Sequence, residues 1–235
     1  MDKQMLNSIR EAEKSSHIEI YSSKKLFESG SWLQKPVKTV TDLLTCFENR
    51  KNLKALDLGC GVGRNCIAIA QKFKSKCRID CVDILEFDIK ELTKYSIEYN
   101  VKNEINGITS SIDDYRISEN EYDLILAVSA LEHTDSSESF KNKIVEINKG
   151  IKSSGIVCLI VNSEITEKNK ESGESLIPQF EVNFKTDELL ELLSNSFSGW
   201  EILKQSISTQ RYDIPRESCV SDLTTNVVTF VAKKP

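Results

Sequence analysis

The sequence predicts an α/β protein built on a doubly wound, mainly parallel sheet of seven strands with an antiparallel C-terminal strand. Two observations carry this prediction. Short apolar runs alternate with amphipathic stretches between residues 54 and 162, and two β-rich runs without a helix between them lie near the end of the chain. Alternation of this kind is typical of parallel sheets with helices on both faces.

Five strands and three helices are expected in the alternating part. The strand ranges are Lys54–Leu58, Arg78–Asp83, Gly107–Ser111, Tyr122–Ser129 and Gly155–Asn162. Apolar residues spaced three or four positions apart predict one buried face on each intervening helix. These faces consist of Cys66, Ile69, Ala70 and Phe73; of Leu85, Ile89, Leu92 and Tyr99; and of Phe140, Ile144, Ile147 and Ile151.

The C-terminal part predicts one more helix and an edge hairpin. Thr186 is expected to cap a helix with Asp187 and Glu188 in its first turn. The runs GWEILKQSIS (199–208) and TTNVVTFVAKK (224–234) follow it, and they are expected to pair antiparallel at one edge of the sheet.

Two polar segments fall outside the alternation. Residues 1–35 carry scattered aromatic side chains, and Ser163–Phe180 follows the fifth strand. We place both at the carboxyl ends of the strands, where open α/β sheets bind ligands. Residues 1–35 are therefore expected to form a small N-terminal cap, and residues 36–235 the main domain. A frayed terminus is the alternative for residues 1–15.

Composition argues against several classes of function. The 31 Lys and Arg residues are outnumbered by 36 Asp and Glu residues, and the net charge of −5 disfavours a nucleic-acid partner. Seven cysteines, an odd number without C-x-x-C spacing, predict reduced thiols and no metal site. A charged start and the lack of about eighteen consecutive apolar residues predict a soluble, cytoplasmic protein without a membrane partner. A small-molecule substrate is expected, and both a monomer and a homodimer stay open.

The stretch ALDLGCGVGRN, residues 55–65, places three glycines directly after the first apolar run. A glycine-rich turn between strand and helix lets the backbone approach a ligand closely. Arg64 stands where a dinucleotide site has its third glycine, and Asp57 would repel a pyrophosphate but attract an ammonium group. Asp83, twenty positions after Gly63, ends the second strand. An acid at this position accepts hydrogen bonds from both hydroxyls of a ribose. The pattern predicts an adenosine-containing ligand with a cationic amino-acid end.

These residues resemble the class I S-adenosylmethionine-dependent methyltransferases. LDLGCGVGRN is similar to the family's first motif, CVDI to its ribose-binding strand end, and YDLILAVSALEH to its fourth strand and exit. The resemblance covers residues 52–162, extends to the final helix and strands, and is nearest to small-molecule enzymes of the tellurite-resistance type. It implies a Rossmann-like methyltransferase domain over residues 36–235, with S-adenosylmethionine as its cofactor.

The resemblance also implies roles for residues of the first two strand ends. Asp57 would reach the methionine ammonium through water, and Asp83 would bind the ribose. The turn beneath the cofactor would be lined by Gly59, Cys60 and Gly61, with Cys60 serving as a small filler rather than a nucleophile.

Further roles follow at the next strand ends. Ile84 would pack on the adenine, and Val128 with its neighbours would flank the reactive methyl group. Many family members place an acid against the adenine amino group, and alignment puts Ser111 there. Either Ser111 and the backbone of Ile112 fill that role, which we favour, or a one-turn shift brings in Asp113.

Glu132 and His133 directly follow the fourth strand and are the candidate catalytic residues. Methyl transfer from a sulfonium is an in-line displacement that depends mainly on alignment. An oxygen or nitrogen nucleophile benefits from a base, whereas a thiolate or selenide arrives activated. One of the two residues is therefore a substrate contact or base. The alternative is that His133 packs or caps the next helix while Glu132 anchors the loop.

Further residues near the expected site carry two interpretations each. Arg64 and Asn65 either contact the methionine carboxylate or hold a neighbouring loop. Tyr21 and Trp32 either cover the cofactor or fill the core of the cap.

His17 is either a surface residue or folded inward by the cap. In QRYDIPRES, Arg211, Tyr212 and Arg216 either receive an anionic substrate or form a solvated hairpin connection.

The sequence thus predicts an S-adenosylmethionine-dependent methyltransferase for a small molecule such as a thiol, a metalloid anion or an amine. A nicotinamide-dependent oxidoreductase and a catalytically silent cofactor-binding module are the alternatives. The fourth-strand exit AVSALEH lacks the D/N-P-P-Y/F motif of enzymes that methylate base amino groups, which argues against those acceptors.

Overall fold

The computed structural model describes residues 9–11, 15, 18, 21–216 and 219–235. One twisted sheet runs through them in the order β3-β2-β1-β4-β5-β8-β7, and a short β6 pairs with β5 outside this path. The strands are β1 (Leu53–Leu58), β2 (Cys77–Asp83), β3 (Ile105–Thr109), β4 (Tyr122–Val128), β5 (Ile151–Asn169), β6 (Ser175–Leu176), β7 (Glu201–Pro215) and β8 (Val220–Lys233). The central strands pair in parallel, and β8 is antiparallel to both β5 and β7. The predicted fold class is confirmed.

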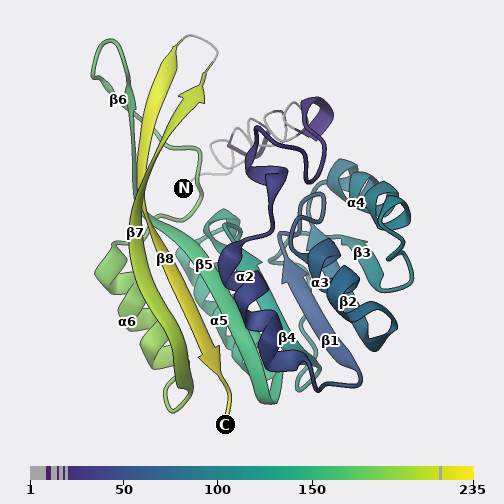
Figure 1. Cartoon of the computed structure of the whole chain (residues 1–235). Coiled ribbons are helices and arrows are strands. Elements are labelled where there is room, and N and C mark those ends of the chain that lie inside the picture. Colours follow the sequence, from purple (N-terminus) through teal and green to yellow (C-terminus); the bar gives the residue numbers. More distant parts are fainter. Residues whose placement is uncertain (1–8, 12–14, 16–17, 19–20, 217–218) are drawn as a thin grey trace.

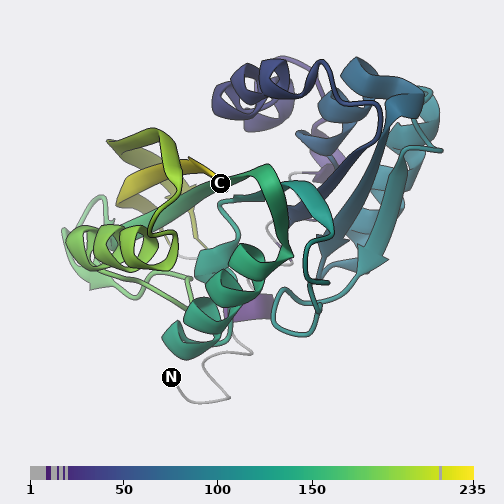
Figure 2. The ribbon, with the colours of Figure 1, turned by 90° about the horizontal axis from the view of Figure 1, so that it is seen from below.

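Helices cover both faces of the sheet (Figures 1 and 2). One face carries α2 (Lys38–Leu43), α3 (Cys66–Phe73) and α4 (Glu86–Glu98), and the other carries α5 (Ser137–Gly150) and α6 (Thr186–Ser196). Short 3-10 helices are η1 (Trp32–Gln34), η2 (Leu44–Phe47), η3 (Lys74–Lys76) and η4 (Leu131–His133).

Alternate residues of each central strand enter opposite hydrophobic cores. In β1, Ala55 packs with α3, whereas Leu56 and Leu58 pack with α5 and α6. In β4, Leu126 lies in the same core as Ala55, and Ala127 lies in the same core as Leu56 and Leu58. Strands that are buried on both faces consist of nearly continuous apolar runs, so their positions could be predicted from the sequence.

The segment expected as a polar insertion after the fifth strand begins as strand. β5 continues to Asn169 and pairs with β8 as far as Ser221, after a register shift between Ser163 and Thr166. Ser163, Ile165 and Glu167 are buried in alternation with exposed neighbours. Because β7 and β8 extend equally far, the hairpin rises beyond the helical layers (Figure 1).

The described part of the N-terminal segment packs against α4. Residues 9–11, 15, 18 and 21–23 are helical, and Leu26 is buried in the same core as α3. The Leu26 backbone N–H donates to the Tyr95 hydroxyl at 3.2 Å, and the Tyr99 hydroxyl donates to the Leu26 carbonyl at 3.2 Å. His17, considered above as a surface or inward-facing residue, lies outside the described residues.

The start of α6 differs from the prediction by one residue. Lys185 occupies the N-cap position, and Thr186 is the first helical residue. The Thr186 hydroxyl instead bonds the side chains of Ser163 (3.0 Å) and Glu164 (2.9 Å), which join α6 to β5. Within the described chain, no helix has the length and apolar character to cross a bilayer.

Candidate active site

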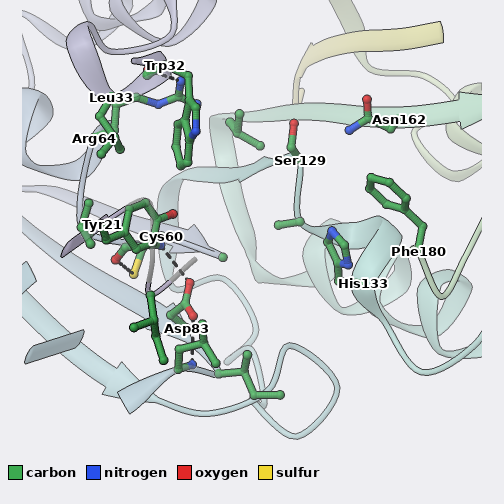
Figure 3. Close-up of a pocket in the computed structure, with 18 of the residues that line it drawn as sticks. Tyr21, Trp32, Leu33, Cys60, Arg64, Asp83, Ser129, His133, Asn162 and Phe180 are labelled. Carbon is green, nitrogen blue, oxygen red and sulfur yellow. Dashed lines mark hydrogen bonds between the residues drawn. The ribbon is translucent and has the colours of Figure 1, made fainter. Parts of the chain in front are cut away.

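A cavity of about 1990 Å³ lies at the carboxyl ends of the parallel strands. Open α/β sheets bind ligands at this edge. Its walls come from the N-terminal segment, the turn after β1, the ends of β2 and β4, the segment before α6, and the extended β7–β8 hairpin. In Figure 3, Asp83, Cys60, Tyr21 and Arg64 lie on one side, and Ser129, His133, Asn162 and Phe180 on the other.

The glycine turn after β1 is tight because the chain's own side chains approach it. The backbone N–H groups of Gly59 and Cys60 both donate to the Val82 carbonyl, at 2.8 and 3.0 Å. A Cβ on Gly61 (φ +51°) would lie 2.9 Å from the Tyr21 hydroxyl, and one on Gly63 (φ +101°) would lie 2.5 Å from a methyl group of an α4 leucine. Gly63 thus accommodates helix packing, whereas Gly61 borders the cavity.

Asp57 lies in β1 beneath this turn and is 1% exposed. Its Oδ2 has no hydrogen-bond partner among the described residues. Burial raises the pKa of Asp57 to about 7; the nearby Arg64 guanidinium and the Cys66 backbone N–H lower it, while Asp83 raises it. A buried acid with an unused oxygen fits a cationic group bound above it.

Asp83 and Ile84 form an edge suited to a nucleoside at the end of β2. The Asp83 carboxylate accepts the N–H of Gly61 at 2.8 Å through Oδ2 and that of Leu85 at 3.0 Å through Oδ1. Ile84 lines the same cavity and is 49% exposed, which leaves an apolar surface for a flat ring.

Ser111 and Ile112, which follow β3, also line the cavity. The Ser111 hydroxyl donates to Asp114 Oδ2 at 2.8 Å and accepts the Asp114 N–H at 3.1 Å. Asp113 is absent from the described lining, and its carboxylate accepts the Asp135 N–H at 3.2 and 3.4 Å. The geometry therefore favours Ser111 and Ile112 over Asp113 as the neighbours of a bound ring.

Arg64 and Asn65 hold the N-terminal chain against the turn. Arg64 Nη1 donates to the Trp32 carbonyl at 2.9 Å, and its guanidinium lies 5.0 Å from the Trp32 ring centre. Asn65 Oδ1 accepts the Val37 N–H at 3.0 Å. Tyr21 meets Trp32 edge to face at 5.6 Å, and both rings line the cavity. Arg64 thus combines a loop-holding contact with a position in the cavity wall.

The exit of β4 displays Val128 and Ser129 to the cavity. Ser129 adopts a left-handed backbone (φ 50°), and its N–H donates to the Ile160 carbonyl at 2.7 Å. Glu132 is fully buried and absent from the described lining, and burial raises its pKa. Its Oε1 accepts the backbone N–H of Asn162 at 3.1 Å and also the Asn162 side-chain amide. Asn162 itself lines the cavity.

His133 lines the cavity and is paired with a buried acid that sequence reasoning missed. Its Nδ1 lies 2.9 Å from Glu181 Oε2, and the Glu181 side chain is 1% exposed. The imidazole stacks on Phe180 with ring centres 5.1 Å apart (Figure 3). Arg10 Nε lies 3.5 Å from Glu181 Oε1. No motif in PQFEVNF signals Glu181, because its partners come from segments far away in the sequence.

The basic cluster expected near residues 211–216 is neutralised by acids. Arg211 forms an ion pair with Asp222, and Arg216 donates two hydrogen bonds of 2.7 Å to the buried Glu167. Arg211 lines the cavity, but Arg216 does not belong to the described lining. The Arg211–Asp222 pair therefore joins β7 to β8, and the Arg216–Glu167 pair joins the end of the hairpin to β5.

The thiol of Cys60 borders the cavity, and burial raises its pKa, so it stays protonated at neutral pH. Across the described residues, no group of three or more His, Cys, Asp or Glu side chains is arranged to hold a metal ion.

The strand order, the acid beneath the glycine turn and the acid at the end of β2 define the class I S-adenosylmethionine-dependent methyltransferase fold. The unpartnered Asp57 oxygen fits the cationic amino-acid end of S-adenosylmethionine, and Asp83 with exposed Ile84 fits its adenosine.

Comparison with known proteins agrees with this class. A family model described as a methyltransferase domain matches residues 55–155. Ajmaline N-methyltransferase of Rauvolfia serpentina is 23% identical over 151 residues, which are 64% of this chain and 47% of that protein. The ubiquinone biosynthesis O-methyltransferase of Rickettsia bellii (strain OSU 85-389) is 25% identical over 113 residues, 48% of this chain and 43% of that protein. The chain thus spans less than half the length of these relatives.

Among solved structures, TehB from Haemophilus influenzae has the same fold. It is 20% identical with a TM-score of 0.64, and the match covers 92% of this chain and 66% of that one. A geranyl diphosphate methyltransferase in complex with S-adenosylmethionine matches with a TM-score of 0.57 at 10% identity, over 84% of each chain.

Proposed function

We propose that this chain is an S-adenosylmethionine-dependent methyltransferase that acts on a small-molecule acceptor. The observation that carries the proposal is the shared cavity of about 1990 Å³, which is lined by Asp83 in one part and by His133 and Phe180 in another (Figure 3). Ligand pockets commonly measure about 300–1,000 Å³. The cavity therefore has room for a cofactor and a second molecule, as group transfer between two bound molecules requires.

The adenosine end of the cofactor is held by residues that follow β2 and β3. Asp83 binds the two ribose hydroxyls through its carboxylate. Ile84 packs on the adenine from one side. Ser111 and the backbone of Ile112 contact the adenine edge, and Val128 lies near the reactive methyl group. All five residues line the cavity, which supports these roles.

The methionine end lies over the turn formed by Gly59, Cys60 and Gly61. Asp57 attracts the ammonium group through water, because its side chain is buried beneath the turn and does not border the cavity. Tyr21 and Trp32 cover this end from the N-terminal segment. Their contacts with each other and with Arg64 support a covering that excludes water.

The bound cofactor supplies a methyl group on a sulfonium sulfur, which is the electrophile. The chain's contribution is to orient the acceptor beside it. His133 is the acceptor contact, since it lines the cavity opposite Asp83 (Figure 3). Glu132 acts one step away, by holding Asn162 in the cavity wall. The curated relatives carry names of an N-methyltransferase and an O-methyltransferase, which supports an organic acceptor.

Cofactor binding is tested by calorimetric titration with S-adenosylmethionine and with NADH. S-adenosylmethionine is expected to bind and NADH is not, because the buried Asp57 repels a pyrophosphate. Hydrogen bonds to charged groups contribute about 1.5–3 kcal/mol each, so Asp83→Ala is expected to weaken binding at least about tenfold. Asp83→Asn retains one acceptor oxygen and is expected to lose less affinity for S-adenosylmethionine than Asp83→Ala.

An exposed acid of α6 provides the control, and Asp187→Ala is expected to leave affinity unchanged. Affinity for S-adenosylmethionine that survives Asp83→Ala intact contradicts the assignment. Turnover is followed with methyl-labelled cofactor and a panel of small amines, phenols, thiols and selenite. A protein that binds the cofactor and labels no acceptor is a silent binding module.

A further inference from the structure

We propose that the acceptor is an organic molecule with an apolar body and an amine or hydroxyl nucleophile, deprotonated by His133 while Glu181 holds the imidazole. This inference rests on the proposed methyltransferase function and narrows its substrate class. It separates an organic acceptor from the metalloid anions and thiols that the sequence left open.

At the cavity wall, the His133 imidazole is paired with a buried carboxylate. Glu181 Oε2 lies 2.9 Å from His133 Nδ1, and Phe180 stacks on the ring, so two contacts from one segment fix its orientation. A proton on Nδ1 donates to the carboxylate, which leaves the lone pair of the neutral ring on Nε2. Arg10 lies beside Glu181, and the buried Glu132 interacts electrostatically with His133. One cation and two acids therefore surround the imidazole.

The cavity wall also contains a set of apolar side chains, called the apolar wall below. Ile160 of β5, Leu223 and Val227 of β8, and Ile214 of β7 line it together with Phe180. Ile160 and Leu223 are 7% and 4% exposed. Three of these residues belong to the β7–β8 hairpin, which thus contributes apolar surface that suits a hydrocarbon or aromatic body. A metalloid oxyanion has no apolar part to place there.

The cationic side chains of the described lining already have partners. Arg10 pairs with Glu181 and Asp135, Lys90 with Glu86, and Arg211 with Asp222. The fourth, Arg64, bonds a carbonyl and lies over the Trp32 ring. An oxyanion would have to compete for these cations, whereas a neutral acceptor leaves every pair intact.

The transfer step balances with these groups alone. A bond forms between the acceptor nitrogen or oxygen and the methyl carbon as the carbon–sulfur bond breaks, and its electron pair stays on sulfur. The acceptor's N–H or O–H proton passes to His133 Nε2. The imidazolium is stabilised by Glu181 and later releases the proton to solvent.

The acceptor class is tested with methyl-labelled S-adenosylmethionine and four groups of probes: arylalkylamines, phenols, arylalkyl thiols, and selenite or tellurite. Amines or phenols with an apolar body are expected to accept the label. Truncating that body to methylamine is expected to raise KM, because the apolar wall then has nothing to contact.

The base is tested with His133→Gln and Glu181→Gln. A general base contributes about 10²–10⁴-fold, so His133→Gln is expected to lower kcat in that range for amines while labelling of thiols changes little. Glu181→Gln retains a hydrogen-bond acceptor and should lower kcat less than Glu181→Ala, with KM preserved. Glu181→Gln should also move the acid limb of the profile of kcat against pH to lower pH, because the imidazolium loses its anionic partner. Asp187→Asn, on the exposed face of α6, is the control.

The outcomes separate this inference from the function on which it rests. If S-adenosylmethionine fails to bind the wild-type chain, the proposed function itself fails. If the cofactor binds but selenite or tellurite is labelled in place of amines and phenols, only this inference is overturned. The same holds if no amine or phenol is labelled, or if His133→Gln keeps full amine activity.

Discussion

Affinity for S-adenosylmethionine is expected to rise with pH through the ionisation of Asp57. Burial raises the pKa of this carboxyl to about 7, so the protonated form dominates in mildly acid solution. A methionine ammonium is attracted only by the ionised form. The cofactor therefore binds more tightly as Asp57 loses its proton, and binding at acid pH drives that proton into solvent.

The size of the effect follows from that pKa. With a pKa of about 7, roughly a tenth of the protein is ionised at about pH 6 and roughly three quarters at about pH 7.5. The dissociation constant is therefore expected to fall about eightfold over this interval, which corresponds to about 1.2 kcal/mol. The interval ends just below the usual pKa of an α-amino group, about 7.7–8.0, so the ligand keeps most of its positive charge.

Calorimetry at each pH, in two buffers of different ionisation enthalpy, measures both the affinity and the protons released. Asp57→Asn is expected to show a weaker and nearly constant affinity, without the extra proton release near pH 6. A wild-type dissociation constant that stays flat over this range refutes the reasoning. An equal slope in Asp57→Asn refutes the assignment to Asp57.

Three other expectations concern the turn, the hairpin and the cap. Gly63→Ala places a Cβ 2.5 Å from an α4 methyl group at φ +101°, so unfolding by urea should show a loss of about 1–3 kcal/mol, larger than for Gly199→Ala, where no atom lies within 4 Å. Arg216→Met leaves the buried Glu167 without its cationic partner and should lower the free energy of unfolding in urea by about 3–5 kcal/mol. An unchanged urea midpoint would show that the pair contributes nothing to stability. Saturating cofactor should change the emission of Trp32 in a variant lacking the other tryptophan, because Trp32 lines the cavity; an unaltered spectrum would place the ligand elsewhere.

The strands and helices that build the doubly wound sheet follow from patterns that depend on local packing. β1 begins one residue before the predicted range, and β4 ends one residue earlier than predicted. Both are buried on two faces, so nearly every residue is apolar and the boundaries are sharp. The acids at positions 57 and 83 could be located because a strand–turn–helix unit fixes their spacing from the glycines.

The parts that escaped prediction depend on partners distant in the sequence. The continuation of β5 to Asn169 requires β8 as its neighbour, and its polar residues gave no apolar signal. Glu181 becomes a partner of His133 only when the segment before α6 folds back over the β4 exit. Likewise, Arg211 and Arg216 looked available for an anion because Asp222 of β8 and Glu167 of β5 meet them only in the folded sheet.

A crystal structure of the chain with S-adenosylhomocysteine tests the central claim most directly. We predict that the Asp83 carboxylate contacts both ribose hydroxyls, that the adenine lies on Ile84, and that the sulfur opens toward His133 and the apolar wall. A ligand whose ribose lies away from Asp83, or whose sulfur is closed off from the His133 side of the cavity, would contradict the account.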